Sequence, residues 1–200
     1  MKEKVVVAII ILWSAVLLMG SSCRRLSTAH LRSAACDGDI KKATNLLELG
    51  VDVNATDGLG YSALIDAEAC ARHGDLTQSR VELVELLITK GAVVNHRASD
   101  GSTALMDAAR NGDTPAVNAL LRSGASVNMA DNEGGTALMR AAASSCNEET
   151  VRALLNAGAD LTARDHKGRN ALDSFRASYA CPESKVGDLL QKATTGGGGK

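Results

Sequence analysis

The feature that most constrains this chain is a segment that recurs along it with nearly constant length. In its most regular copy, residues 100–128, a tight turn leads into a short Ala-rich stretch, then into a stretch with a Leu-Leu pair, and ends at a glycine and a short exit. The four equivalent glycines, Gly50, Gly91, Gly124 and Gly158, are 41, 33 and 34 residues apart. Such a period is typical of proteins that stack small helical units side by side. The spacing therefore predicts a repeat array.

The residues within each copy follow a more specific pattern. From Asp100 the chain reads Asp-Gly-Ser-Thr-Ala-Leu-Met-Asp-Ala-Ala, and from Val117 it reads Val-Asn-Ala-Leu-Leu-Arg-Ser-Gly-Ala-Ser-Val-Asn. This pattern resembles the ankyrin repeat, whose motif is Asp-x-x-Gly-x-Thr-Pro-Leu-His-x-Ala-Ala followed by Val-x-x-Leu-Leu-x-x-Gly-Ala-x-x-Asn. The resemblance implies an all-α solenoid of about five helix-turn-helix repeats with hairpin loops, in which the first and last repeats act as caps.

Two departures from that motif occur in both regular copies. Ala104 and Ala137 replace the proline of the family, and Met106 and Met139 replace its histidine. Alanine is a good helix former at the start of a helix, so the first change leaves the fold intact. The methionines predict an apolar, adaptable seam between repeats in place of a network of histidine hydrogen bonds.

Composition and charge exclude some classes of function. The chain has 45% apolar residues, 22% charged residues and a formal net charge of -1, which fits a soluble body and implies no nucleic-acid partner. Aromatic residues make up only 2%, as expected where small residues let helix pairs stack closely. We expect a monomer that binds another protein.

Residues 1–22 have the order of a signal peptide: two lysines, an apolar run over residues 5–19, and then small residues. Cys23 follows directly and resembles the modified cysteine of a bacterial lipoprotein, although Gly20 stands where that family has leucine. Three forms stay open: a lipoprotein, a cleaved secreted protein and an uncleaved N-terminal anchor.

All three forms place the repeats outside the cytoplasm. The expected location is the periplasm or cell envelope, with attachment to the membrane through Cys23, and the alternative is a secreted protein. The repeat domain is expected over residues 26–192. The glycines near the end make residues 193–200 a predicted flexible tail.

Four further cysteines form two pairs with repeat spacing. Cys36 and Cys70 are 34 residues apart, and Cys146 and Cys181 are 35 apart. Each pair is expected near the end of the first helix, or in the following loop, of adjacent repeats. Stacked helices lie about 10 Å apart, whereas a disulfide needs Cα atoms within about 7 Å, so a disulfide requires a distorted loop. Two disulfides and four free thiols both stay open.

The second repeat, residues 57–95, is eight residues longer than a 33-residue period, and the insertion falls between its helices, within residues 68–80. Extra residues on a repeat lie on one face and often take part in recognition. A merely lengthened helix pair is the alternative, since long surface loops cost little. The fourth repeat has one extra residue near Ser144.

No combination of residues indicates catalysis. The chain has no Ser-His-Asp order with supporting context, no Gly-rich phosphate loop and no paired carboxylates in a predicted pocket. Its histidines lie singly, without the spacing of metal ligands. Asp107 and Arg140 are interpreted as an ion pair between neighbouring repeats. We therefore expect no enzyme activity, no cofactor and no metal site.

The ankyrin resemblance implies binding through the hairpin tips and the concave surface of the first helices. The matching positions are Leu59, Tyr61, Asp100, Ser102, Arg110, Asn111, Asn132, Glu133, Ala143, Ser144, His166, Lys167 and Arg169. The function indicated first is an extracytoplasmic scaffold that holds or protects an envelope protein. An inhibitor or immunity protein that caps a toxin or enzyme is the alternative, and a hydrolase that uses the 68–80 insertion is a third, from another class.

Overall fold

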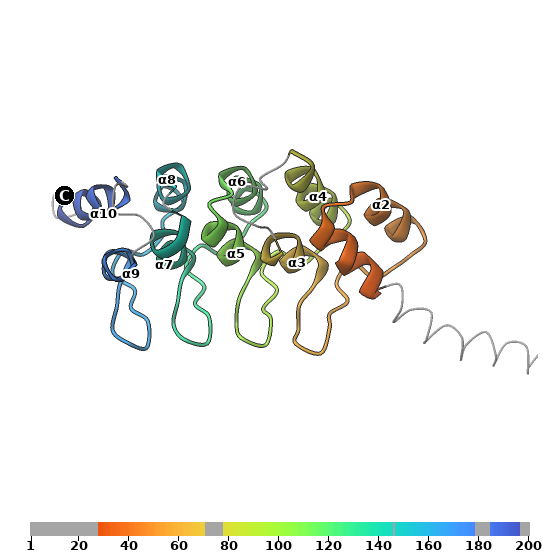
Figure 1. Ribbon diagram of the computed structural model, residues 1–200, viewed down its shortest axis with the longest axis horizontal. Coiled ribbons are helices and arrows are strands. Elements are labelled where there is room, and N and C mark those ends of the chain that lie inside the picture. The colour runs from red at the N-terminus through yellow and green to blue at the C-terminus, as the bar shows by residue number, and fades with distance from the viewer. Residues whose placement is uncertain (1–27, 71–77, 146, 179–184, 197–200) are drawn as a thin grey trace, which may run out of the picture.

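A computed structural model describes residues 28–70, 78–145, 147–178 and 185–196. Its helices form two parallel rows, with hairpin loops projecting beside one of them (Figure 1). The row nearer the hairpins, called the inner row, holds the helix over residues 28–37, α3 (Ala63–Ala69), α5 (Ala104–Asn111), α7 (Ala137–Arg140) with its continuation η1 (Ala141–Ser145), and α9 (Ala171–Ala177). The outer row holds α2 (Ile40–Glu48), α4 (Gln78–Thr89), α6 (Thr114–Arg122), α8 (Glu148–Asn156) and α10 (Val186–Gly196).

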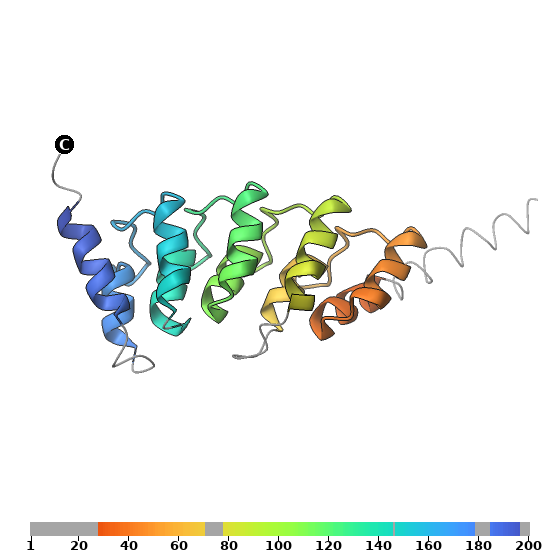
Figure 2. The ribbon, with the colours of Figure 1, turned by 90° about the horizontal axis from the view of Figure 1, so that it is seen from above.

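Each inner helix pairs with one outer helix, and the pairs stand side by side along the array (Figure 2). Successive inner helices contact one another, and so do successive outer helices. This arrangement confirms the predicted all-α solenoid of helix-turn-helix repeats. Among the described residues, no helix is both long and apolar enough to span a bilayer.

Side-chain caps fix where the helices begin. The hydroxyl oxygens of Ser62, Thr103 and Thr136 accept hydrogen bonds from backbone N–H groups in the first turns of α3, α5 and α7. Asp113 caps α6 and Asn147 caps α8 in the same way. These caps satisfy N–H groups that have no partner within a helix, so the recurring Thr or Ser of the motif sets the register of each inner helix.

Small residues allow the inner helices to pack closely. Ala108, Ala109, Ala141 and Ala142 are fully buried, and larger side chains such as Leu120 fill the space between the rows. Among the described residues, the fully buried part of this apolar core contains no aromatic side chain, and the half-buried Tyr61 and Phe175 pack against it.

The substituted motif positions also lie in the core. Met106 is 1% exposed and Met139 is 5% exposed, which confirms the apolar seam predicted for them.

The hairpins are joined by backbone hydrogen bonds from one repeat to the next. Each bond has the same geometry: a donor N–H in one tip meets the carbonyl of the preceding tip, as Ser99 N meets Leu59 O at 2.8 Å and His166 N meets Glu133 O at 2.8 Å. Gly101 has a φ of +82° and lies against the next hairpin, and a Cβ there would come within 2.6 Å of the Asn132 Oδ1 atom. Glycine is therefore required where the tips approach most closely.

Three asparagines clamp the exit turns together. The side-chain amide of Asn95 donates to the carbonyl of Gly124 at 3.0 Å, and its oxygen accepts from the N–H of Ser126 at 2.8 Å. Asn54 and Asn128 make the equivalent pair of bonds to the following repeats. Each amide uses both its donor and its acceptor, so neighbouring exit turns are held in one register.

The extra residue of the fourth repeat, expected near Ser144, is accommodated in the π-helical turn η1 (Ala141–Ser145). A π-helical turn is wider than an α-helical one because its hydrogen bonds join residues i and i+5. At the C-terminus, α10 continues to Gly196, so the predicted tail over 193–200 begins too early. Ala193 and Thr194 continue the helix, and Thr194 donates its hydroxyl to Gln191 O.

A disulfide joins Cys36 to Cys70, with the two Cα atoms 5.1 Å apart. It links the ends of the inner helices of the first and second repeats, one of the two pairings that the spacing suggested. The second suggested pair, Cys146 and Cys181, lies outside the described residues, as do residues 1–27 with Cys23.

Candidate binding groove on the concave face

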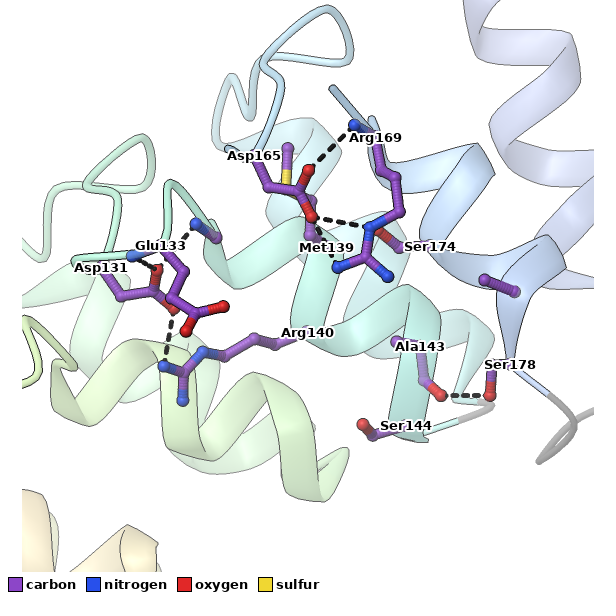
Figure 3. Close-up of a pocket in the computed structure, with 12 residues that line it drawn as sticks. Asp131, Glu133, Met139, Arg140, Ala143, Ser144, Asp165, Arg169, Ser174 and Ser178 are labelled. Carbon is purple, nitrogen blue, oxygen red and sulfur yellow. Dashed lines mark hydrogen bonds and ion pairs between the residues drawn. The ribbon is translucent and has the colours of Figure 1, made fainter. Parts of the chain in front are cut away.

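A groove of about 340 Å³ lies between the fourth and fifth repeats, beside their hairpins (Figure 3). Four of the predicted binding residues line it: Glu133, Ala143, Ser144 and Arg169. The other lining residues are Asp131, Gly135, Met139, Arg140, Asp165, Ser174, Ala177 and Ser178. Its volume is within the range of small ligand pockets, so it can hold one or two side chains of a partner.

The first wall of the groove is organised by Asp131. Its Oδ1 atom accepts the backbone N–H groups of Glu133 and Gly135, each at 2.8 Å, and its Oδ2 atom accepts from Arg140 at 2.8 Å. Burial opposes ionisation of Asp131, but the hydrogen bonds from Arg140, Gly135 and Glu133 outweigh it and lower the pKa of Asp131. The carboxylate is therefore charged at neutral pH and holds the hairpin in shape.

The opposite wall repeats this arrangement around Asp165. Arg169 donates its Nε to Asp165 Oδ2 at 2.8 Å and its Nη2 to the same atom at 2.6 Å. The backbone N–H groups of Lys167 and Arg169 donate to Asp165 Oδ1, each at 2.9 Å. Hydrogen bonds from the Arg169 side chain and backbone lower the pKa of Asp165. Each wall of the groove thus contains an aspartate already paired with an arginine.

Arg140 also reaches the neighbouring repeat. Its Nη1 atom lies 3.3 Å from Asp107 Oδ1, which confirms the predicted ion pair between repeats. Asp107 is 2% exposed, burial raises its pKa, and Arg110 provides a second positive partner at 3.1 Å. One arginine therefore holds together the groove wall and the seam between the third and fourth repeats.

The floor of the groove combines apolar and polar groups. Met139, Ala143 and Ala177 line it. The hydroxyl groups of Ser174 and Ser178 donate to the carbonyls of Asn170, at 2.9 Å, and Ala143, at 2.5 Å. Because the Ser174 hydroxyl has one proton, its remaining capacity is as an acceptor.

Two predicted binding residues lie inside the protein instead of on its surface. Ser102 is 1% exposed and donates to Asp100 Oδ1, and Asn111 is 7% exposed and donates its amide to the carbonyl of Glu68 at 2.6 Å. Both satisfy polar groups within the fold, which corrects their assignment to the binding surface.

The other predicted residues lie outside the groove. Tyr61 is part-buried and donates its hydroxyl to Asp100 Oδ2 at 3.1 Å, so both belong to the contact between two hairpins. Leu59 stands out at a tip with 64% exposure. The side chain of Arg110 is 40% exposed beside Asp107. The remaining three are exposed on the hairpins of the fourth and fifth repeats: Asn132, His166 and Lys167.

Reasoning from the motif missed the two aspartates that shape the groove. Asp131 and Asp165 each lie five residues before the N-cap residue of the inner helix of their repeat. Asp57 has the same place in the second repeat and accepts the backbone N–H groups of Leu59 and Tyr61 in the same way. That recurrence was a usable signal. Ser174 and Ser178 gave no such signal, because only the stacking of α9 against η1 brings them to the groove.

The end of α3 contains charged residues that the sequence assigned to a surface insertion. Glu68 is fully buried within α3, and Arg80, at the start of α4, is 3% exposed. Arg80 donates to the carbonyl of Ala67, while neither carboxylate oxygen of Glu68 has a hydrogen-bond partner among the described residues. Burial raises the pKa of Glu68 to about 8, the nearby Asp113 adds to this shift, and Arg80 opposes it.

The helices therefore occupy both ends of the expected insertion. α3 ends at Ala69 and α4 begins at Gln78, so residues 68–80 are not a single exposed loop. The middle of that segment, residues 71–77, lies outside the described residues. The described part of the chain contains no group of three or more His, Cys, Asp or Glu side chains that could hold a metal ion.

Stacked helix pairs with aligned hairpins and a groove between them define a helical-repeat solenoid of the kind that binds other proteins. A family model described as "Ankyrin repeats (3 copies)" matches the chain twice, over residues 31–128 and 69–165. The chain belongs to the ankyrin-repeat family. Members of this family are typically non-catalytic scaffolds for protein–protein interaction, and this is the class of function that the fold supports.

Proposed function

We propose that this protein is an extracytoplasmic scaffold that holds or protects an envelope protein, and that its partner docks in the groove between the fourth and fifth repeats. The observation that carries the proposal is the groove itself. Asp131 and Asp165 fix its two walls through backbone N–H groups, so the groove exists before a partner arrives. A preorganised site loses little conformational entropy when it binds.

Two observations support a location outside the cytoplasm. Residues 1–22 have the order of a signal peptide. The Cys36–Cys70 disulfide is of a type that persists in oxidising compartments and is rare in the cytosol. Attachment through a lipid on Cys23 would hold the first repeat close to the membrane, since residues 24–27 alone separate that cysteine from the first described helix.

Photocrosslinking in cells tests the docking site. A photoreactive amino acid at position 144 faces the groove, and the same amino acid at position 82 lies on the outer helix α4 as a control. We expect position 144 to give a discrete crosslinked product with another envelope protein and position 82 to give none. Equal products from both positions, or none from either, would overturn the proposed docking site.

Thiol trapping tests the compartment. Cells are alkylated before lysis, and the protein is then compared with and without reduction. We expect Cys36 and Cys70 to resist alkylation until the sample is reduced, and the protein to be accessible to an external protease in spheroplasts. A fully alkylated, protease-protected protein would contradict the proposed location.

A further inference from the structure

We infer that the Cys36–Cys70 disulfide and the buried carboxyl group of Glu68 form one switch, in which reduction of the disulfide by a dithiol is coupled to release of a proton by Glu68. The switch lies in the first two repeats, away from the groove, and it does not depend on the docking function.

The disulfide holds the end of α3 against the first repeat. Cys70 is the C-cap residue of α3, and Cys36 lies in the helix over residues 28–37. Both cysteines are partly exposed, so a dithiol can reach the bond. In the exchange the protein disulfide becomes two thiols and the dithiol becomes a disulfide, so two hydrogens pass from the reductant to the protein. Glu68 lies two residues before Cys70, in the last turn of α3.

The carboxyl group of Glu68 is buried without compensation. Its side chain is fully buried, and neither oxygen has a hydrogen-bond partner among the described residues. Burial raises the pKa of Glu68 to about 8; Asp113, the N-cap of α6, adds to the shift, Arg80 of α4 opposes it, and Asp107 of α5 adds further. Glu68 is therefore mainly protonated at neutral pH while the end of α3 stays closed.

The charged side chains of the first inner helix are paired with other groups. Arg32 binds Asp66 at 2.6 Å and Asp57 at 2.8 Å, and Asp37 accepts a hydrogen bond from Ser33. Asp66, one turn before Cys70 in α3, thus has a counter-charge that Glu68 lacks. Of the acids at this end of the second repeat, Glu68 is the one that burial keeps neutral without a hydrogen bond.

Two side-chain hydrogen bonds also hold the end of α3. Arg80 donates to the carbonyl of Ala67, and Asn111 donates its amide to the carbonyl of Glu68 at 2.6 Å. Terminal turns of helices open locally at a low free-energy cost. Once the disulfide is reduced, only noncovalent contacts keep an unsatisfied carboxyl group inside the core. Opening of this turn brings Glu68 to water, where its pKa returns to the ordinary 4.5 and the proton is released.

The coupling has a defined direction. Between pH 4.5 and 8 the oxidised protein carries a proton on Glu68 that the reduced protein has lost, so a higher pH favours reduction and a lower pH favours the closed, oxidised form. A rise in pH and a supply of dithiol therefore act together to loosen the second repeat. Thiol–disulfide changes at the end of a packed element work as switches in this way.

The test measures the equilibrium between the purified protein and dithiothreitol at pH 5.5, 6.5 and 7.5, approached from both the oxidised and the reduced side. After alkylation, mass spectrometry of the peptides that contain Cys36 and Cys70 gives the reduced fraction. Thiols stay mainly protonated in this range, so an uncoupled disulfide gives a constant that does not change with pH. For the parent we expect the constant to rise by up to about tenfold per pH unit.

Glu68→Gln should abolish that rise, because the amide carries no titrating proton. Glu82→Gln, an exposed position on α4, is the matched control and should behave as the parent does. A constant that does not change with pH in the parent, or one that rises as steeply in Glu68→Gln, would overturn the switch.

Amide hydrogen exchange distinguishes local opening from unfolding of the array. We expect reduction to speed exchange in the last turn of α3, at residues 67–70, and to leave exchange in α5 unchanged. Equal acceleration in both helices would mean that reduction unfolds the protein, and the switch would then be rejected.

Discussion

Two seams of the array differ at a single motif position. In the third and fourth repeats, Ala109 and Ala142 occupy the second alanine of the motif, and both are fully buried. In the second repeat the same position is Glu68, also fully buried. The regular seam between the third and fourth repeats closes with methyl groups, and its buried carboxylate, Asp107, is paired with Arg140. In the irregular seam the buried carboxyl group of Glu68 has no hydrogen-bond partner among the described residues.

The difference shows what an insertion can change in a repeat protein. Glu68 lies at the end of α3, which stops at Ala69. Arg80, near the start of α4, lies beside this end and donates to the carbonyl of Ala67. Asp113, which caps α6 from the next repeat, is buried beside them and keeps one carboxylate oxygen without a partner among the described residues. The Cys36–Cys70 disulfide joins the first repeat to the same end of α3, where Cys70 is the C-cap residue. We therefore expect the stability of the second repeat to depend on the disulfide and on the protonation of Glu68, and that of the third repeat to depend mainly on packing.

Leu120→Ala should have the largest effect, because Leu120 is fully buried in the regular part of the array. Truncation of such a side chain removes packing and leaves a cavity, so we expect a loss of about 2–5 kcal/mol in the free energy of unfolding. Leu154→Ala should behave similarly. Denaturant unfolding measures the change, with Leu49→Ala, at an 82% exposed position, as the control. A loss below about 1 kcal/mol at Leu120 would contradict the described stacking.

Removal of the disulfide should come next. The double variant Cys36→Ala/Cys70→Ala opens a loop of 34 residues, and we expect a loss of about 2–4 kcal/mol. Unfolding of the parent protein with and without a reductant measures the same difference. The double variant should not respond to the reductant. Equal stability of the oxidised parent and the double variant would show that the second repeat does not depend on the bridge.

The pH dependence distinguishes the two seams directly. The pKa of Glu68 is about 8 in the folded protein, against 4.5 for the ordinary group, so between these values the folded state binds one more proton than the unfolded state. Stability contributed by this group is therefore greatest below pH 4.5 and falls as pH rises toward 8, by up to about 1.4 kcal/mol per pH unit.

Glu68→Gln should remove that slope and make the protein about 1–3 kcal/mol more stable than the parent at pH 8. Unfolding free energies at pH 5, 6.5 and 8 measure the effect, and Glu82→Gln is the control. Asp66, Asp107 and Asp113 also have raised pKa values, so the difference between parent and variant is the relevant quantity. Parallel pH profiles for the parent and Glu68→Gln would contradict the buried, protonated state of Glu68.

Arg140→Gln should have the smallest effect on stability. The side chain of Arg140 is 20% exposed, and Asp107 retains Arg110 as a partner, so we expect a loss of about 1 kcal/mol that shrinks as salt is added. Unfolding at low and high ionic strength measures it. A loss as large as that of Leu120→Ala would mean that the regular seam depends on charge as much as the irregular one does.

Much of the fold was predictable because the motif encodes it locally. The caps at Thr103 and Thr136, the glycine exits and the buried leucines each follow from one residue in a fixed place. The ion pair of Asp107 with Arg140 was also predictable, since residues 33 apart face each other in such an array. The fold and these contacts follow from the motif and its period together.

The groove was predictable only in part. Four residues at motif positions predicted to face the concave side do line it: Glu133, Ala143, Ser144 and Arg169. Ser102 and Asn111 lie at similar positions but turn inward to satisfy buried polar groups. The motif fixes where a residue stands on the backbone, whereas its hydrogen-bond partners decide whether the side chain reaches solvent. For Glu68, the insertion hid its equivalence to Ala109.

The asparagine clamps have a consequence for how this chain can change over evolution. Asn54, Asn95 and Asn128 each lie four residues after an exit glycine, and each closes onto the following exit turn. A residue added or lost there would break both hydrogen bonds of a clamp. The insertions that this chain does contain, in the second and fourth repeats, lie between the two helices of a repeat, at the opposite end from the clamps. Gain or loss of a whole repeat would instead restore every clamp. The array can therefore vary by duplication or deletion of complete units, and by residues added at one end only.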